Sequence, residues 1–379
     1  TTDFAEIVAK KNLKLTKGHI VASTLHRAKI LAKSFSVFGL AYTPSTSSRD
    51  IGVSCTAGST RPGQLLSSRL RAVKKRISKV KNLERVSRTA RKLFNASAYP
   101  AATFGHPACG LTPDQLLKLE RNALSCTGIS PHGRCRETSL VVAFGLQGTP
   151  SARIIRETVQ LWFQLLNTNS FSVSELTKAW KAARVSISNN TKLHKSIHGI
   201  MSNLIVILLR AGWFPYAFDR WIDREKNHWI LNPQLSSTGV VAQIIRDTHF
   251  AQLPRISQHF NGLGMENGID WEYSLRLLRS LRKTDYNRAC ALETIMCGAA
   301  WPGSRVQSIN PLFSDLCPRC EASPETQLHA FWECPCNNNI NDNTVKSTQN
   351  LARHAIWESE THPCLWLRGL LPAPRVHVD

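Results

Sequence analysis

The chain has 379 residues, 42% of them hydrophobic, and a formal net charge of +22 at pH 7. This length allows two or three domains with a substantial core, and the apolar content excludes a chain that is disordered throughout. The longest apolar run, residues 204–209, is far shorter than the ~20 residues of a membrane-spanning helix. The first residues show no signal peptide, and the start without Met predicts a fragment of a longer protein.

The positive charge is concentrated at the beginning of the chain. Residues 1–100 hold 20 of the 48 Lys and Arg residues but only four of the 26 Asp and Glu residues. Such an excess predicts a surface that binds a polyanion, and nucleic acid is the polyanion we expect. An acidic membrane surface is the alternative, but the basic stretch lacks Trp or Phe on its apolar side, so we expect no membrane partner.

Residues 18–54 are predicted to form strands and turns. The segments 19–23 and 35–42 are rich in β-branched and aromatic residues, which favour strands. Residues 44–48 are typical of a turn, and residues 50–55 are predicted to form another short strand. The β content of the chain should therefore be small.

A long amphipathic helix is predicted over residues 64–96. Its apolar residues recur every three or four positions on one stripe, namely Leu66, Leu70, Val73, Ile77, Val80, Leu83, Val86, Ala90 and Leu93. The opposite face is cationic, continues to Arg91 and Lys92, and has Glu84 as its only acid. A solvated helix face usually mixes charges that form i,i+4 pairs, and this one does not. We therefore expect the cations to contact phosphates of nucleic acid through Arg69, Arg71, Lys74, Lys75, Arg76, Lys79, Lys81, Arg85 and Arg88.

Further helices follow along the chain. Thr112, Pro113 and Gln115 fit the N-cap, N1 and N3 positions of a helix start. Helical periodicity then recurs at residues 137–145, 151–167, 173–184, 192–210, 239–250, 271–281 and 286–297. These elements predict a mainly α (α+β) fold. The ten Trp residues are expected in the core.

The eleven cysteines are scattered over the whole chain. This distribution is unlike the dense disulfide framework of a short secreted domain, so we expect an intracellular, reducing compartment, the nucleus or the cytoplasm. Near the C-terminus, four metal-binding residue types follow the spacing C-x2-C-x8-H-x4-C, namely Cys317, Cys320, His329 and Cys334.

This spacing predicts a structural zinc site. A C-x2-C turn presents two sulfurs to one ion, and three thiolates with one imidazole form a closed tetrahedral site that leaves no position for catalysis. Chance spacing among 11 Cys and 13 His residues is the alternative. Cys336 is a second candidate for the fourth ligand, although Pro335 keeps it from sharing a helical turn with Cys334.

Four segments occur in an order that is also found in one family of polymerases. They are Leu15-Thr-Lys17-Gly-His-Ile-Val, Arg49-Asp-Ile-Gly-Val-Ser, Tyr99-Pro-Ala-Ala-Thr-Phe-Gly with Gly110-Leu-Thr-Pro, and His329-Ala-Phe-Trp-Glu-Cys334-Pro. Together they resemble the region downstream of the catalytic palm in non-LTR (LINE-type) retrotransposon reverse transcriptases. In that family the corresponding parts are a strand after the catalytic aspartates, the palm–thumb junction, the region beyond the first thumb helix, and a zinc knuckle.

The resemblance implies a domain order and several residue roles. Lys17 would lie near the incoming nucleotide, and Arg49, Asp50, Ile51 and Gly52 would form a primer-grip-like hairpin. The partners would be an RNA template and an RNA–DNA hybrid or DNA target, with no small-molecule substrate site. The segments would be the palm end at 1–60, a basic thumb-like domain at 61–150, a helical linker at 151–312, the CCHC knuckle at 313–340 and a C-terminal tail at 341–379.

The chain also departs from the family in one respect that matters for catalysis. Polymerases of this kind hold two Mg²⁺ ions with carboxylates, and no Asp-Asp pair occurs in this sequence. We therefore expect the catalytic hairpin and its Mg²⁺ before Thr1, and we predict no catalytic residue and no polymerase activity in this chain alone. The alternatives are a stand-alone zinc-dependent nucleic-acid-binding protein and a decayed element fragment without activity.

Overall fold

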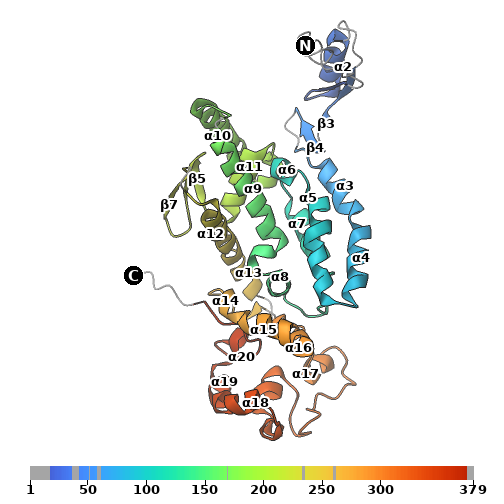
Figure 1. Cartoon of the computed structure of the whole chain (residues 1–379), viewed down its shortest axis with the longest axis vertical. Helices are drawn as coiled ribbons and strands as arrows, with labels where there is room; N and C mark the ends of the chain where they lie inside the picture. The colour runs from blue at the N-terminus through green and yellow to red at the C-terminus, as the bar shows by residue number, and fades with distance from the viewer. Residues whose placement is uncertain are drawn as a thin grey trace. The chain divides into compact units, whose positions relative to one another are not determined.

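The computed structural model describes residues 18–35, 42–50, 52–57, 61–168, 170–232, 235–258 and 262–373. Helices account for most of these residues, and the strands belong to small two- and three-stranded sheets (Figure 1). The predicted mainly α (α+β) class is therefore confirmed. Within the described ranges, no helix is both long enough and apolar enough to cross a membrane.

The chain forms two compact units, and each is assembled from separate stretches of sequence. Unit 1 comprises Thr1–Lys79, Leu93–Leu119 and Pro150–Asp247, and unit 2 comprises Val80–Lys92, Glu120–Thr149 and Thr248–Asp379. Residues 61–150, expected as one thumb-like domain, thus contribute to both units. Residues 341–379, expected as a tail, belong to the same unit as the metal motif.

Unit 1 begins with a β–helix–β element and a hairpin. Strands β1 (Gly18–Val21) and β2 (Tyr42–Ser45) pair in parallel, and β3 (Ser47–Asp50) pairs antiparallel with β4 (Val53–Thr56). A parallel pair needs a crossover, and helix α2 (Leu25–Phe35) lies in that connection. The prediction of strands and turns alone over 18–54 was therefore wrong at α2, which packs its small residues Ala28 and Ala32 inward.

The predicted helix over 64–96 is shorter and interrupted. It consists of α3 (Gln64–Ala72) and α4 (Lys74–Glu84), followed by the 3-10 turn η2 (Arg88–Arg91) and the π-helix η3 (Phe94–Ala98). The apolar stripe is buried from Leu66 to Val80, but Leu83 and Val86 are exposed. The chain is extended at Ser87, and the helix does not continue there. The segment that follows turns back, so that α5 (Tyr99–Thr103) packs against α3 and η3 packs against α5.

The rest of unit 1 is a helical layer with one small sheet. The prediction at Thr112 is confirmed, because its hydroxyl accepts from Gln115 N (3.1 Å) while Gln115 Oε1 accepts from Thr112 N (3.0 Å) at the start of α7 (Pro113–Leu124). The other elements are α6 (His106–Cys109), α9 (Pro150–Asn167), α10 (Val173–Ser188), η5 (Leu193–Ser196), α11 (Ile200–Arg210), β5 (Phe214–Ala217), β6 (Arg220–Ile222), β7 (His228–Ile230) and α12 (Ser237–Phe250).

Tryptophans supply much of the core of unit 1. Trp162 and Trp180 pack with ring centroids 5.7 Å apart, and Trp162 donates to the Phe218 carbonyl at 3.0 Å. Trp213 and Trp221 are fully buried. The apolar run over 204–209 forms the buried middle of α11, which packs beside α9. The expectation for tryptophan fails at Trp357 in unit 2, whose side chain is 85% exposed.

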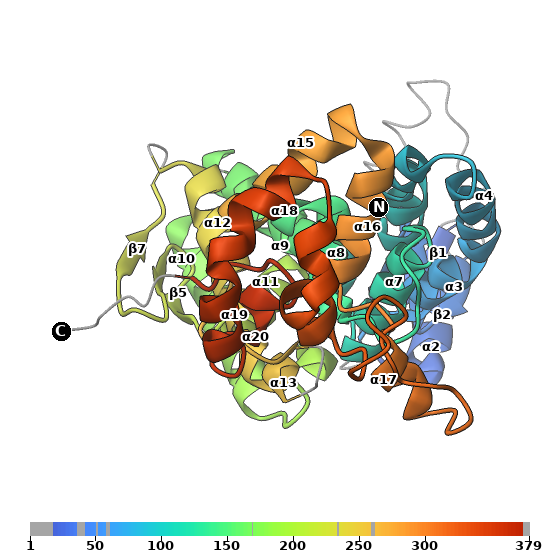
Figure 2. The same cartoon turned by 90° about the horizontal axis from the view of Figure 1, so that it is seen from below.

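Unit 2 has its own hydrophobic core, formed by residues such as Val142, Leu253, Met265, Leu278 and Cys297. Its further helices are α8 (Arg136–Phe144), η4 (Leu146–Gly148), α13 (Leu253–Ser257), α14 (Trp271–Ser274), α15 (Arg276–Thr284), α16 (Tyr286–Met296), α17 (Gly303–Gln307), η7 (His329–Glu333), η8 (Pro335–Asn339), α18 (Asn343–Thr348), η9 (Gln349–Leu351), α19 (Ala352–Glu358) and α20 (Pro363–Trp366). Figure 2 shows α18, α19 and α20 together at the end of the chain.

The last residues are tied into this core. Cys364 and Leu370 are buried, and the Cys364 thiol donates to the Gly264 carbonyl at 2.8 Å. The buried Arg368 guanidinium donates to Met296 O (2.8 Å) and Thr138 Oγ1 (3.0 Å). Residues 341–373 are therefore part of the packed unit, because their side chains fill and cap its interior.

Candidate metal centre and nucleic-acid interface

Four side chains of unit 2 meet at one point. One ligand atom from each of Cys317, Cys320, His329 and Cys334 lies within 4.8 Å of all the others, so the group could hold a metal ion. The Sγ atoms of Cys317 and Cys334 are 3.9 Å apart, and Cys320 Sγ is 3.3 Å from His329 Nε2. A tetrahedron with metal–sulfur arms of ~2.3 Å has sulfur–sulfur edges of roughly 3.8 Å. The spacing therefore suits a closed four-coordinate site.

The first two ligands are presented by a tight loop. Leu316 and Pro324 form a β-bridge, Cys317 N donates to Ser323 O (2.8 Å), and Glu321 N donates to Cys317 O (2.8 Å). Glu321 has φ +53°, a left-handed conformation that closes the turn after Cys320 at a modest cost for a non-glycine residue. The loop brings both thiols to one side.

The other two ligands come from one helical turn and its end. His329 is the first residue of η7, and Cys334 is its C-cap, with Cys334 N donating to His329 O at 2.9 Å. Cys336 is not part of the cluster, because its thiol donates to the Arg319 carbonyl at 3.1 Å. The choice of Cys334 over Cys336 as the fourth ligand is therefore supported by the structure.

The electrostatics of the loop favour a thiolate at Cys317. Backbone N–H groups of Arg319 and Cys320 point at its sulfur and, with His329, lower the pKa of Cys317 to about 6. Burial raises the pKa of Cys334 to about 11. A bound cation would remove the proton from both thiols, since metal ligation requires the thiolate form.

The metal loop is braced by the segment that follows it. Arg319 donates to Ala330 O and to Asn337 Oδ1, each at 2.6 Å. Trp332 donates to the Trp366 carbonyl at 2.8 Å, and the two rings meet edge to face at 5.5 Å. A substitution at the metal centre should therefore also alter the packing of α20.

Most of the predicted nucleic-acid-binding cations are exposed on α3 and α4. The exposed ones are Arg71, Lys74, Lys75, Arg76, Lys79 and Lys81, together with Arg85 directly after α4. With 100° between successive helical residues, Lys75 and Lys79 lie opposite the buried Ile77 and Val80. The helix thus buries its apolar stripe and turns its cations to water, as the sequence indicated for this stretch.

Arg69 has a different role from its neighbours. Its guanidinium donates to Gly52 O and Phe104 O, each at 2.6 Å, and lies 5.0 Å from the Phe104 ring centroid. It therefore joins the β3–β4 hairpin and the turn after α5 to α3. Burial lowers the pKa of Arg69, as does the charge of Arg49.

The hairpin contains most of the residues expected to grip a primer. Arg49 is exposed on β3, Asp50 pairs with Val53 across the ladder, and Gly52 takes a φ of +82° in the turn, which glycine adopts without strain. Ile51 and Lys17 lie outside the described residues. The roles assigned to these residues stay predictions.

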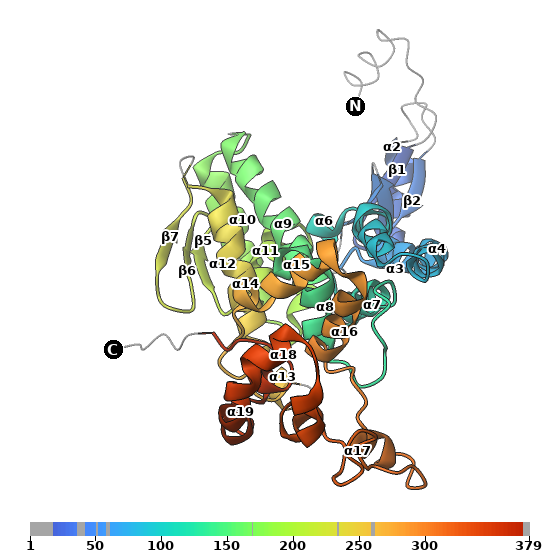
Figure 3. The same cartoon turned by 60° about the horizontal axis from the view of Figure 1, so that its bottom comes forward.

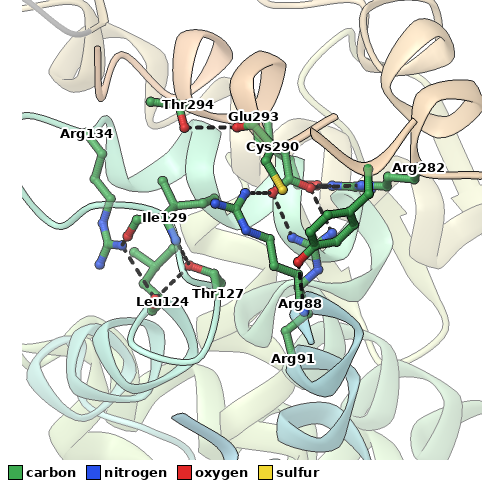
Figure 4. Close-up of polar contacts among 12 residues, drawn as sticks. Arg88, Arg91, Leu124, Thr127, Ile129, Arg134, Arg282, Cys290, Glu293 and Thr294 are labelled. Atoms are coloured by element: carbon green, nitrogen blue, oxygen red, sulfur yellow. Dashed lines mark hydrogen bonds and ion pairs between the residues drawn. The ribbon is translucent and has the colours of Figure 1, made fainter. Parts of the chain in front are cut away.

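Arg88 points into unit 2 rather than outward. Arg88, Arg91 and Arg282 surround one carboxylate, that of Glu293, at 2.9, 2.9 and 2.7 Å (Figure 4). The Glu293 side chain is only 2% exposed. The sequence contained no signal for this cluster, because Arg88 and Arg91 are about 200 residues from Glu293 and Arg88 matched the cationic pattern of the preceding helix.

The three arginines determine the protonation of Glu293. Burial disfavours its charged form, but the hydrogen bonds and charges of Arg91 and Arg282 outweigh burial, so the pKa of Glu293 lies below its usual range. The carboxylate therefore stays ionised and balances part of the positive charge within unit 2.

No family model, no curated protein and no solved structure matches this chain significantly. The resemblance to reverse transcriptases therefore stays a prediction.

The first prediction separates the two candidate fourth ligands. Cys334→Ala should lower the bound metal below one ion per chain and change the fluorescence of the Trp332–Trp366 pair, whereas Cys336→Ala should keep one ion. Metal content by atomic emission and tryptophan emission spectra provide the measurements. Loss of the ion in Cys336→Ala with retention in Cys334→Ala would overturn the assignment.

The second prediction concerns the arginine cluster. Glu293→Gln should lower the free energy of unfolding by about 3–5 kcal/mol, because it leaves desolvated guanidinium groups without their counter-charge. Glu360→Gln, at an exposed position, is the matched control and should have little effect. Urea unfolding of both variants measures the difference.

The same cluster predicts a pH dependence. Since the folded pKa of Glu293 is lowered, its contribution is present above the unfolded pKa, near 4.5, and disappears as pH falls through the folded pKa. The wild-type protein should therefore lose more stability below about pH 4.5 than Glu293→Gln does. Equal acid sensitivity of the two proteins would contradict this.

Proposed function

We propose that this chain is the nucleic-acid-gripping, C-terminal part of a retrotransposon-encoded RNA-directed DNA polymerase of the non-LTR type. Its exposed cationic face on α3 and α4 would contact the phosphates of a template–primer duplex. The observation that carries the proposal is this face, where seven Lys and Arg side chains are exposed over a buried apolar stripe. Like charges this close repel one another unless a polyanion neutralises them.

The contacts of Arg69 support the polymerase part of the proposal. The family resemblance rests partly on the Arg49–Gly52 block and on the Tyr99-to-Gly105 block, which are some 50 residues apart in sequence. Arg69 holds carbonyl oxygens of Gly52 and Phe104 at the same time. A hairpin that is to place a primer end beside a thumb helix needs such a rigid junction.

The metal centre would hold a structural zinc ion. Three thiolates and an imidazole are the donors that zinc prefers, and four protein ligands leave no position for a substrate. The ion would order the loop between Leu316 and Cys336, which contains little hydrophobic core of its own. Its role in this proposal is to stabilise a surface of unit 2.

The chemical step would belong to residues outside this sequence. No Asp-Asp pair occurs in the chain, so Mg²⁺-dependent nucleotidyl transfer would depend on a polymerase core encoded elsewhere. The partners would be RNA and an RNA–DNA hybrid or DNA target, in the nucleus or cytoplasm, where the eleven free thiols and the metal site would be maintained.

A stand-alone zinc-dependent nucleic-acid-binding protein is the second candidate. The missing Asp-Asp pair favours it, because the cationic face and the metal centre do not require a polymerase. The reading frame that precedes Thr1 distinguishes the two. A Tyr/Phe-x-Asp-Asp hairpin encoded there supports the polymerase, and a frame without one supports the binding protein.

The third prediction tests the cationic face. Lys75→Gln with Lys79→Gln should weaken binding to an RNA–DNA hybrid and reduce the slope of log affinity against log salt by about 2, since each lost phosphate contact removes roughly 0.9. Lys346→Gln with Arg353→Gln removes the same charge from exposed positions on α18 and α19 and should leave the slope unchanged. Fluorescence anisotropy across a salt series gives both values.

The fourth prediction is that the chain alone has no polymerase activity. Purified chain with a template–primer, Mg²⁺ and deoxynucleotides should bind the duplex without extending the primer. Measurable primer extension would show that the chain holds a catalytic centre and would overturn this part of the proposal.

A further inference from the structure

The small sheet of unit 1 has an outer face that carries aromatic side chains in water. Its strand order is β5-β6-β7, and α10 and α11 pack against β5 (Figure 3). Phe214 is 51% exposed, His228 is exposed and Tyr216 is half-buried. An exposed aromatic cluster on a sheet is unusual unless it binds something.

The strand register places these residues on the same side. Phe214 pairs with Ile222 and Ile222 with His228, and directly opposed residues share a face. Tyr216 sits in the irregularity between Pro215 and Ala217. Its ring centroid is 6.5 Å from those of both Phe214 and His228, so it belongs to the same face.

The opposite face of the sheet is already occupied by core residues. Trp221 is fully buried, and Trp213 packs against Trp221 at 6.2 Å and against Trp229 at 5.6 Å. The aromatic residues of the outer face are therefore additional to the residues that hold the sheet in place. Their exposure is not explained by the packing of unit 1.

Cations lie next to the aromatic face. The Arg184 guanidinium of α10 lies 5.1 Å from the Phe214 ring centroid and donates to Tyr216 O at 3.0 Å. Arg220 is 57% exposed on β6, and it lies two residues before Ile222, the partner of His228, so it is on the same face of the sheet. Lys178 and Lys181 are exposed on the same helix as Arg184.

The nearby acids balance only part of this charge. Asp223 is buried, and its carboxylate accepts from Glu225 N, Asn227 N and Trp229 Nε1 within the hairpin. Asp219 is 3.9 Å from Arg220, and Glu225 is exposed. Residues 173–230, which include α10, α11 and the sheet, together contain nine Lys and Arg residues and four acids, so this part of the chain has a net positive charge.

We infer that this face binds a single-stranded nucleic-acid segment by stacking unpaired bases on Phe214, Tyr216 and His228. Arg184 and Arg220 would contact the connecting phosphates. Aromatic rings on an open sheet flanked by cations are the features with which proteins hold single strands, and stacking needs no particular base sequence. The inference goes beyond duplex gripping by α3 and α4, because that contact depends on phosphates alone.

The positive surroundings favour a single strand over an apolar protein partner. The phenyl and phenol rings of Phe214 and Tyr216 are nearly parallel, with 18° between their planes, and so offer flat surfaces in one orientation. Nucleobases present flat π-faces together with a negative backbone. The rings of this face would stack on the bases, and its cations would pair with the phosphates.

The test compares binding of a ten-nucleotide single-stranded RNA with binding of an RNA–DNA hybrid. Phe214→Ala and Tyr216→Ala should each weaken single-strand binding by roughly ten-fold, within the range of a lost base–aromatic contact. Tyr216→Phe keeps the ring and should bind as the wild type does. An abasic strand of the same length should bind the wild type more weakly than the RNA does, by a factor that shrinks in the Ala variants.

Two controls keep the outcome interpretable. Phe171→Ala removes a ring that is 54% exposed but lies outside the sheet, and it should leave single-strand binding unchanged. Thermal unfolding of each variant confirms that the sheet still forms. If Tyr216→Ala is unfolded, the comparison of RNA with the abasic strand on wild-type protein still decides, because stacking predicts a difference and phosphate contact alone predicts none.

The result also separates this inference from the proposed function. Unchanged single-strand binding in folded Phe214→Ala and Tyr216→Ala overturns the stacking site, while hybrid binding that depends on Lys75 and Lys79 still supports the grip by α3 and α4. Loss of single-strand binding in the Ala variants supports the stacking site even where the Lys75 and Lys79 variants bind hybrid normally. Equal binding of RNA and abasic strand by the wild type overturns the inference outright.

Discussion

The constraint on which this structure depends is a large positive charge with few carboxylates to balance it. Arginine and lysine residues occupy different positions in the fold. Buried and half-buried arginines donate to backbone carbonyl oxygens, as Arg61 does to Cys109 O and Arg368 to Met296 O, or share a single carboxylate at Glu293. Every lysine in the described part of the chain is exposed. The planar guanidinium, with five donors and weak hydration, can be buried where an ammonium cannot.

This division leaves a surface charge that the protein itself does not neutralise. On α3 and α4 the exposed cations form a ridge suited to phosphates, and beside the β5–β7 sheet they flank aromatic rings suited to bases. In the proposals made above, the two features would contact different parts of a nucleic acid, its backbone and its unpaired bases. The proposed grip and the inferred stacking site are therefore chemically distinct and can be tested separately.

The metal centre of unit 2 lies in a segment that cannot be ordered by hydrophobic packing alone. A short loop around Cys317 and Cys320 has little apolar surface to bury, so a bound metal ion would supply the order that packing does not. The loop is nevertheless not isolated, since Trp332 and Trp366 link it to α20, and the buried Arg368 links that end of the chain to α16. Binding of a metal ion would thereby be coupled to the packing of the last helices.

Features that depend on neighbours in sequence were determined by the sequence itself. The capping residues Thr112 and Gln115 act at one helix start and the C-x2-C-x8-H-x4-C spacing acts within one short segment, and both formed as predicted. The helix predicted over 192–210 formed in part, as η5 and α11, because the chain is extended at Gly199. The end of α4 and the orientation of Arg88 depend on partners far away in sequence, which periodicity does not reveal. Only the tertiary structure decided that Arg88 should turn to Glu293, because the energy of a buried carboxylate depends on which charges the fold brings around it.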